Sequence, residues 1–255
     1  MLCSRVLNSN SAERPRISVL IPAFNEEQFI AAAIDSVRES FRAADCASYE
    51  LIVCDNNSTD QTAAVARTKG ATVVFEGHNQ ISRARNAAAA VARGEWLIFL
   101  DADTHLSGEL LSATMAALDS LKVCGGGSVI HCDADKFGLL PSALLTCWNT
   151  ISRVCRLAAG SYVFCARQAW IDVGGFDERY YAAEELFFSR RVRHWGKQRE
   201  MRFVILTGAP IVTSARKFEW YGGRHLLGSL LKLSIPGALK RRERCGDWYT
   251  RPEGK

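Results

Sequence analysis

The sequence predicts an α/β fold, a Rossmann-like mixed sheet flanked by helices. Two observations predict it. Through the first hundred residues, short apolar strands alternate with segments whose apolar residues recur at helical spacing, which is typical of a doubly wound sheet. The second observation is the segment 94–105, in which a nearly continuous apolar run ends on Asp101 and Asp103. A run of this kind predicts a central strand covered on both faces.

The first half contains four predicted strands in strict alternation with three predicted helices. The strands are expected at 17–21, 50–54, 71–75 and 96–100, and the helices at 30–41, 61–68 and 83–93. Asn25 is followed three residues later by Gln28, a capping-box pattern that predicts a helix N-cap at Asn25. The polar turn 55–60 is expected to cap the second helix.

The second half is less regular. Helices are expected at 107–121, at 136–157 and from 184 to about 196, and strands at 122–132, 160–166, 202–206 and 210–213. The helix at 136–157 is amphipathic. Two interpretations of it remain open, namely packing on the protein and lying on a membrane surface.

Composition and charge exclude several classes of protein. The 255 residues carry a net charge of +5, and the whole excess lies in residues 222–255, which argues against a nucleic-acid-binding body and for a basic C-terminal surface. The nine cysteines form no Cys-x-x-Cys pair and no zinc-ligand spacing, so we expect reduced thiols of a cytosolic protein. No apolar segment is long enough to cross a bilayer, and residues 1–7 are too short and too polar for a signal peptide.

The two carboxylates after the fourth strand predict a binding site. Ligands of open parallel sheets bind at the carboxyl ends of the strands, where Asp101 and Asp103 fall. If the strand continues through them, both side chains point to the same side. Paired carboxylates suit Mg²⁺ or Mn²⁺ that bridges to substrate phosphates, although an isolated Asp-x-Asp is also typical of a simple turn. The segment 22–27 replaces the glycine-rich loop of a nicotinamide dehydrogenase, and no Walker loop is present.

Five motifs in this order make the chain similar to a known family. They are 18–26 (SVLIPAFNE), 53–60 (VCDNNSTD), 82–86 (SRARN), 101–103 (DAD) and 174–178 (GGFDE) followed by Glu184 and Glu185. With these motifs the chain resembles the family 2 glycosyltransferases, whose fold is called GT-A, over residues 16 to 220. The resemblance implies a nucleotide-sugar donor, a UDP- or GDP-sugar, lying across the strand ends together with Mn²⁺ or Mg²⁺.

The resemblance also assigns donor-binding and metal-binding residues. The donor-binding residues implied are Pro22, Ala23, Asn25, Glu26, Asp55, Asn56, Ser58, Arg85, Asn86, Asp101, Ala102 and Arg216. Asp55 would face the base, Arg85 and Asn86 the base or ribose, and Arg216 the diphosphate. Asp103 would bind the metal, with Asp101 and His105 as further candidate ligands. An ordinary loop histidine is the alternative interpretation of His105.

The catalytic assignment follows from the same resemblance. The family usually carries Glu-Asp where this chain has Glu184-Glu185, and the second acid acts as general base. The implied base is therefore Glu185, with Glu184 orienting the substrate. An acceptor that is already an ionised phosphate would need no base. The resemblance favours an inverting displacement of a hexose.

The expected organisation is a loose tail (1–15), a nucleotide-sugar-binding half (16–105), an acceptor-binding half of the same domain (106–220) and a basic amphipathic tail (221–255). The acceptor is expected to be a saccharide or a lipid-linked molecule, and not nucleic acid. The C-terminal tail either packs on the body or contacts the inner face of a membrane from the cytoplasm. Two other hypotheses remain, a nucleotidyltransferase and a non-catalytic nucleotide-sugar-binding module. The oligomeric state stays open.

Overall fold

The computed structural model describes residues 14–131, 138–214, 228 and 237–249. Its strands are β1 (Ile17–Ala23), β2 (Tyr49–Asp55), β3 (Thr72–Phe75), β4 (Trp96–Leu100), β5 (Thr104–His105), β6 (Val123–His131), β7 (Tyr162–Ala166) and β8 (Arg202–Thr213). Its α-helices are α1 (Ile30–Ala43), α2 (Thr62–Thr68), α3 (Ile81–Val91), α4 (Gly108–Asp119), α5 (Leu139–Cys155), α6 (Arg167–Asp172) and α7 (Glu184–Lys197). Two 3₁₀ helices follow, η2 (Ala238–Lys240) and η3 (Arg242–Trp248).

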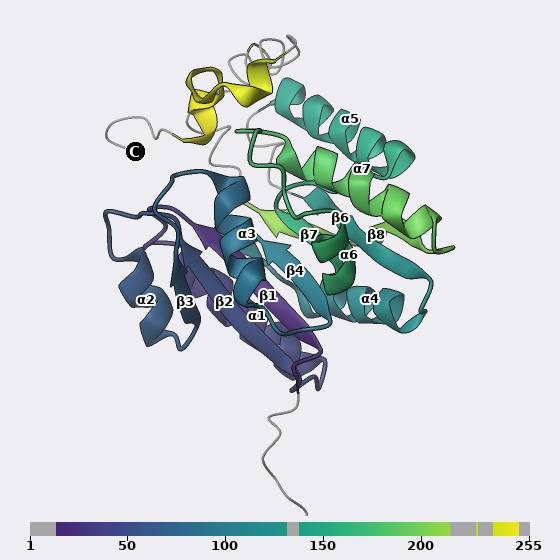
Figure 1. The fold of residues 1–255 in the computed structure, drawn as a ribbon, viewed down its shortest axis with the longest axis horizontal. Coiled ribbons are helices and arrows are strands. Elements are labelled where there is room, and N and C mark those ends of the chain that lie inside the picture. Colours follow the sequence, from purple (N-terminus) through teal and green to yellow (C-terminus); the bar gives the residue numbers. More distant parts are fainter. Residues whose placement is uncertain (1–13, 132–137, 215–227, 229–236, 250–255) are drawn as a thin grey trace, which may run out of the picture.

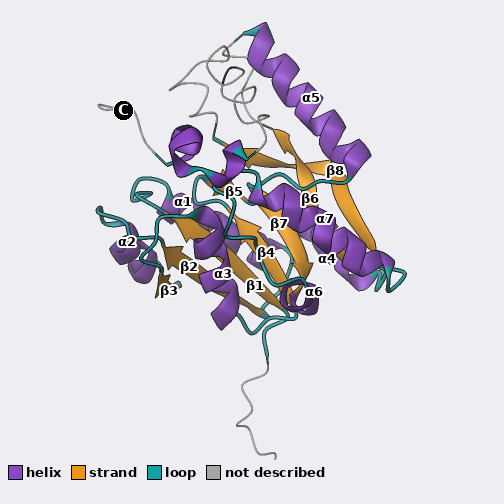
Figure 2. Cartoon of the chain, turned by 45° about the horizontal axis from the view of Figure 1, so that its top comes forward, coloured by secondary structure: helices purple, strands orange, loops and turns teal. Residues whose placement is uncertain are grey.

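The strands form one mixed sheet in the order β3-β2-β1-β4-β7-β6-β8-β5. Figure 1 shows the sheet, and β5 is labelled in Figure 2. The first four strands along the chain, β1 to β4, are parallel to one another. Strand β7 runs antiparallel to β4 and β6, β8 is parallel to β6, and β5 is antiparallel to β8. The predicted mixed sheet is confirmed, and so is the alternation of strands and helices in the first half.

Helices cover both faces of the sheet (Figure 2). The alternation of side chains along β4 shows how the two faces are filled. Ile98 and Leu100 are buried in the core that contains residues of α1 and α4, whereas Leu97 and Phe99 are buried in the core that contains residues of α3 and α7. The prediction of a strand covered on both faces is therefore confirmed for 96–100. Its two neighbours differ, because β1 lies parallel to it and β7 antiparallel.

The predicted capping box is wrong. Helix α1 begins at Ile30, and its N-cap residue is Phe29, which makes no side-chain cap hydrogen bond. Asn25 instead adopts a left-handed conformation with φ of 53°, which asparagine tolerates better than most residues. Its side-chain oxygen accepts a hydrogen bond from the backbone N–H of Thr59 at 2.8 Å. The carboxamide therefore connects two loops and does not cap a helix.

Other boundaries differ where local signals are weak. The two strands expected at 202–206 and 210–213 are one strand, β8, whose pairing with β6 shifts register between Ser128 and Ile130. The two-residue β5 and the six-residue α6 were not predicted. Strand β5 is too short to leave a periodic pattern, and α6 follows β7 without an intervening turn residue. The range 136–157 lies partly outside the described residues, and α5 occupies 139–155 of it.

Residues 237–249 pack on the body of the protein. The backbone N–H of Tyr181 donates to the carbonyl of Leu239 at 2.8 Å, and Ala182 and Cys245 are both buried between the two segments. This part of the predicted tail therefore contacts the loop that precedes α7, and the rest of 221–255 lies almost entirely outside the described residues. Within the described part of the chain, no helix has the length and apolar character needed to cross a bilayer.

The cysteines that the structure describes are free thiols. They are Cys46, Cys54, Cys124, Cys147, Cys155, Cys165 and Cys245. Four of them are buried, whereas Cys147 and Cys155 are exposed on α5. Burial raises the pKa of the Cys54 thiol to about 12 and that of the Cys124 thiol to about 11. These two buried thiols therefore stay protonated near neutral pH.

The close packing of β6 against its neighbours makes a prediction about stability. A Cβ atom at Gly126 would collide with the carbonyl oxygen of Val204 and the ring of Phe164, whereas a Cβ at Gly208 would meet no heavy atom within 4 Å. We expect Gly126→Ala to lower the free energy of unfolding by about 1–3 kcal/mol, the usual cost of overpacking. Gly208→Ala should leave it nearly unchanged. Urea unfolding of the two variants checks this, and equal stabilities would contradict the observed packing.

Candidate active site

The predicted site residues gather at one edge of the sheet. Ala23 pairs with Asp55 where the parallel strands β1 and β2 end, and β4 ends beside them at Leu100. Because β7 is antiparallel to β4, its first residue, Tyr162, pairs with Leu100. The loop that enters β7 therefore lies at the same edge. In this way the topology brings together segments that are far apart in the sequence.

Hydrogen bonds join the loops that follow β1 and β2. The backbone N–H of Asn25 donates to Ser58 Oγ at 3.0 Å, and that of Glu26 donates to Thr62 Oγ1 at 2.7 Å. Asp55 is buried and accepts from the backbone N–H of Ser58 at 3.2 Å. Pro22 and Ala23 are buried at the end of β1. The structure therefore brings the first group of predicted donor-binding residues into one connected surface.

Asn56 holds the next loop to the end of β2. Its side-chain amide donates to the carbonyls of Glu76 and His78, and its side-chain oxygen accepts from the backbone N–H of Gln80. The side chain is buried. Asn56 was predicted to bind the donor, but in this structure its polar atoms are engaged with the 76–80 loop. Its contribution to the site is the position of that loop.

Arg85 is the centre of the site. Its side chain is 1% exposed, although it carries a full positive charge. One terminal nitrogen donates to the carboxylate of Glu184 at 2.5 Å, and the other donates to the carboxylate of Asp101 at 3.1 Å and to the carbonyl of Gly160 at 2.9 Å. A buried charge is tolerated only when it is paired and hydrogen-bonded. Arg85 therefore connects α3, the end of β4, the loop before β7 and the start of α7.

The charges around Arg85 alter the behaviour of the acids. Burial alone lowers the pKa of Arg85, but the carboxylates of Glu184 and Asp101 outweigh it and hold that pKa above its ordinary value. For Glu185, burial and the neighbouring Glu184 carboxylate raise the pKa to about 8, against the opposing effect of Arg85. The Glu185 carboxyl is thus protonated near neutral pH in the free protein. The folded-state pKa of Glu185 lies above the ordinary value of 4.5. The stability that the protonated carboxyl contributes is therefore fully present below about pH 4.5 and is lost as the pH rises to about 8.

Glu185 lies beside the same group of residues. A Cβ atom built on Gly160 would lie 3.3 Å from a terminal nitrogen of Arg85 and 3.5 Å from the carboxyl carbon of Glu185. Gly160 therefore lies next to both side chains, and a methyl group there would be in close contact with the Arg85 guanidinium and in ordinary contact with the Glu185 carboxyl group. Glu185 remains partly exposed, whereas Glu184 is buried. The two adjacent acids therefore differ, with Glu184 held by Arg85 and Glu185 open to an approaching molecule.

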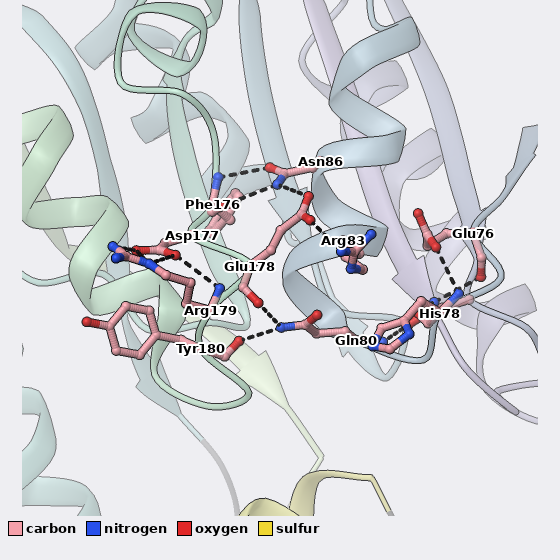
Figure 3. Close-up of polar contacts among 11 residues, drawn as sticks. Glu76, His78, Gln80, Arg83, Asn86, Phe176, Asp177, Glu178, Arg179 and Tyr180 are labelled. Atoms are coloured by element: carbon pink, nitrogen blue, oxygen red, sulfur yellow. Dashed lines mark hydrogen bonds and ion pairs between the residues drawn. The ribbon is translucent and has the colours of Figure 1, made fainter. Parts of the chain in front are cut away.

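The side chain of Asn86 in α3 hydrogen-bonds to the Gly174–Glu178 motif (Figure 3). Its side-chain oxygen accepts from the backbone N–H of Phe176 at 2.8 Å, and its side-chain amide donates to the carbonyl of Phe176 at 2.9 Å. Gly175 has φ of +66°, and a Cβ there would lie 2.6 Å from the Asn86 oxygen. Arg83 pairs with Glu178 at 3.1 Å at the edge of this contact. Asn86 therefore positions a loop, and its polar atoms are engaged there.

Further contacts hold the Gly174–Glu178 motif and the residues after it against α3, β4 and α7. The Gln80 side-chain amide donates to the carbonyls of Glu178 and Tyr180 (Figure 3). On the opposite side, the Phe176 ring stacks on Phe188 of α7 with centroids 4.1 Å apart and meets Phe99 of β4 edge-on at 4.9 Å. The guanidinium carbon of Arg85 lies 5.3 Å from the centre of the Phe176 ring. The Gly174–Glu178 motif therefore fixes the start of α7, where Glu184 and Glu185 lie.

The segment 101–105 leaves the strand geometry that was assumed for it. Strand β4 ends at Leu100, and the Thr104 N–H donates to the carbonyl of Asp101 at 3.1 Å, which closes a turn. The alternation of a strand therefore does not set the directions of the two carboxylates. Ala102 is buried, Asp103 is partly exposed, and His105 is exposed on β5.

The carboxylates of the 101–103 turn fit a metal ion whose remaining ligands come from a substrate. In the part of the chain that is described, no group of three or more His, Cys, Asp or Glu side chains could hold a metal ion. Asp103 is a partly exposed carboxylate at the strand-end turn, and Asp101 beside it bonds Arg85. One or two carboxylates completed by substrate phosphates are the usual protein contribution to a Mg²⁺ site. The residues present therefore fit a divalent ion that binds together with a diphosphate.

Three residues with contacts in this part of the structure were assigned no role from the sequence. Gly160 supplies a carbonyl to Arg85, Phe176 lies beside the guanidinium, and Tyr249 donates its hydroxyl proton to the carbonyl of Tyr181 at 2.8 Å. Gly160 was predicted only as the first residue of the strand 160–166, and a glycine there was the available signal, since backbone contacts at such a position often exclude a side chain. Arg216, predicted to contact the diphosphate, lies outside the described residues.

The sequence of the protein matches a known family. Residues 18–178 match the family described as Glycosyl transferase family 2. This match includes more than half of the chain, and the chain therefore belongs to that family. It is 37% identical over 95 residues to an uncharacterized glycosyltransferase of Rickettsia typhi, covering 37% of this chain and 30% of the relative. An uncharacterized glycosyltransferase of Mycobacterium tuberculosis is 35% identical over 103 residues, covering 40% and 44%. Each match thus spans less than half of the relative's length.

Solved structures of glycosyltransferases share the fold. The mannosyltransferase PcManGT from Pyrobaculum calidifontis superposes with a TM-score of 0.66 at 22% identity, covering 85% of this chain and 63% of that one. Glucosyl-3-phosphoglycerate synthase from Mycobacterium tuberculosis gives a TM-score of 0.63 at 21% identity, covering 95% and 82%. These similarities establish the fold, which is GT-A as the motifs indicated.

The burial of Arg85 predicts a large effect on stability. Arg85→Met leaves the buried Glu184 without its partner, so we expect the free energy of unfolding to fall by about 3–5 kcal/mol. Arg83→Met is the matched control, because the Arg83–Glu178 pair is about 40% exposed on both sides and such pairs contribute about 0–1 kcal/mol. Urea unfolding at pH 7 measures both variants. Similar losses in the two would show that Arg85 does not hold the site together.

Proposed function

We propose that the protein transfers a sugar from a nucleoside-diphosphate sugar to an acceptor hydroxyl, assisted by a divalent metal ion. The observation that carries this proposal is the Arg85 cluster, which joins the strand-end acid Asp101 to the acid pair at the start of α7. Donor-binding loops and a candidate general base thus lie at one edge of the sheet. Family membership supports sugar transfer as the type of reaction.

For the donor, we propose UDP- or GDP-sugars. The solved mannosyltransferase is described in complex with GDP-Man and Mn²⁺, and the glucosyl-3-phosphoglycerate synthase with Mn²⁺, UDP and glucosyl-3-phosphoglycerate. In this chain Asp103 would hold the ion, with Asp101 beside it and His105 as a further candidate ligand. A bound divalent ion would offset the negative charge that grows on the diphosphate as the sugar–phosphate bond breaks. The loops that contain Asn25, Asp55 and Ser58 would bind the nucleoside.

For the acceptor side, we propose that Glu185 removes the proton of the attacking hydroxyl. The raised pKa of about 8 makes Glu185 a stronger base than an ordinary carboxylate once it ionises. The ion pair with Arg85 holds Glu184 in place, and Glu184 thereby fixes the start of α7 next to Glu185. Transfer should therefore become faster as the pH rises through the pKa of Glu185.

The proposal extends to a hexosyl donor, an inverting displacement, and a saccharide or lipid-linked acceptor. Glu185 stands where the family usually carries the Asp that acts as general base, and this position supports the single general base that such a displacement uses. A cytoplasmic location, with the protein on the inner face of a membrane, is part of the same proposal. The basic excess of residues 222–255 supports it.

The test is thermal unfolding with the diphosphates of uridine, guanosine, thymidine and cytidine and with their sugars, each with Mn²⁺ and again with a chelator. We expect one nucleotide to raise the melting temperature by roughly 5 °C or more at saturating concentration, and only with the metal. Asp103→Asn should lose this shift. Glu185→Gln is the matched control. It should keep the shift but release the nucleoside diphosphate from its sugar about 10²–10⁴-fold more slowly.

Two results would contradict the proposal. A shift produced by nucleoside triphosphates and by no diphosphate would favour a nucleotidyltransferase. Binding of a nucleotide sugar with no turnover in the wild type, whatever acceptor is offered, would favour the non-catalytic module.

A further inference from the structure

A hollow lies between α5, α7 and the first residues of β8. It consists of two adjoining cavities of about 510 and 960 Å³, which share Val154, Arg156, Arg202 and Phe203 in their walls. Arg202 pairs with Val123 at the start of β6, and both strands run from there toward the edge that holds Asp103. The hollow therefore opens near the opposite end of these strands from the candidate active site. The donor-binding residues do not line it.

The walls of the hollow are strongly basic. The cations that line it are Arg153, Arg156, Arg190, Arg193, Lys197 and Arg202, and Glu200 is the one acid among the lining residues. Residues 1–221 as a whole carry no net charge, so this concentration of positive charge is local. Arg193 donates to the carbonyl of Cys155, which ties the end of α5 to α7. The cations belong to three elements whose positions are fixed by the fold.

Helix α5 carries an exposed apolar stripe that ends in this hollow. The helix is attached on one side, where the Asn149 side chain makes two hydrogen bonds of 2.9 Å with the backbone of Ile130 in β6. On another face, Leu140, Ala143, Cys147, Ile151 and Val154 recur at helical spacing and are all exposed. Ile151 is 43% exposed and Val154 is 78% exposed. Val154 also lines both cavities, so the stripe and the basic hollow form one continuous surface.

We propose that this surface docks on a membrane of anionic lipids. An apolar helix face flanked by cations is the arrangement of interfacial helices, which bury the apolar face at the headgroup boundary and pair their cations with lipid phosphates. In this chain the exposed stripe would enter that boundary, and the arginines of the hollow would bind phosphate headgroups. A soluble polyanion would use the cations but not the four-turn apolar stripe. Charge and apolar exposure together therefore favour the membrane.

This surface is separate from the C-terminal segment. Residues 237–249 contact the loop before α7, whereas the hollow lies at the other end of that helix. The docking proposal rests on α5, α7 and β8 alone, and it does not depend on the proposed sugar transfer. If the full chain does not bind vesicles, the proposed membrane location fails as well, but the proposed sugar transfer stands, because the two tests measure different quantities.

The test is co-sedimentation of the full chain with vesicles of phosphatidylglycerol or of phosphatidylcholine. We expect binding to the anionic vesicles only, weakened at high salt because the screening length shortens. Arg153→Ser with Arg202→Ser should weaken binding by about 25-fold, since each basic residue near an anionic surface contributes roughly fivefold. Ile151→Glu with Val154→Glu should also abolish most of it. These side chains are exposed, so the variants should fold.

The controls are matched changes elsewhere on the surface. Arg42→Ser with Arg67→Ser removes two exposed arginines from α1 and α2, and Phe75→Glu with Val91→Glu adds two acids at exposed apolar positions of β3 and α3. Both controls should bind like the wild type. Full binding by the arginine variant of the hollow and the glutamate variant of the stripe, or no binding of the wild type to anionic vesicles, would overturn the proposal. So would binding of soluble polyphosphate without vesicles, or a dimer that only the α5 variants dissociate.

Discussion

The buried guanidinium of Arg85 is the interaction on which the site depends. A charge in this position is stable only because two carboxylates and a carbonyl surround it, and these come from β4, α7 and the loop before β7. Asp101 follows β4, the next strand after α3, but Gly160 and Glu184 lie 75 and 99 residues from Arg85 in the sequence. By bonding both acids, Arg85 of α3 fixes the distance between Asp101, at the end of β4, and Glu184, at the start of α7. The contact of the Asn86 side chain with the backbone beside Gly175 supports this arrangement, because it fixes the loop that leads into α7.

The same constraint explains why two adjacent glutamates differ. Glu184 reaches inward and satisfies Arg85, whereas Glu185 stands beside a carboxylate in a poorly hydrated position. Like charges in such surroundings favour the protonated form of one of them. An acid pair of this kind gives one residue a structural role and leaves the other as a titrating group. The extra methylene of Glu185, relative to the family's usual Asp, is accommodated next to Gly160, which has no side chain.

Much of the fold followed from the sequence, because the strands of the first half are short, apolar and separated by recognisable turns. The covered strand 96–100 was predicted from its composition alone, and the side-chain alternation between two cores bears this out. Long-range partners were not predictable in this way. Arg85 is 16 and 99 residues from Asp101 and Glu184, and although the motif 82–86 assigned it to the site, nothing local predicted that it is buried between these acids. Asn25, Asn56 and Asn86 were assigned to the donor from the family motifs, and for the same reason the contacts by which their side chains connect loops of the protein were not predicted.

The raised pKa of Glu185 is the most direct consequence of this arrangement, and it can be measured in the free protein. Glutamate labelled with ¹³C at the carboxyl carbon would be followed by NMR from acid to alkaline pH, with Glu185→Gln used to assign the resonance. One resonance that titrates near pH 8 and is absent from the variant is the predicted result. If every glutamate titrates below about pH 6, the ordinary range for this residue, then Glu185 is not held in the environment described and the Arg85 cluster does not prepare a general base.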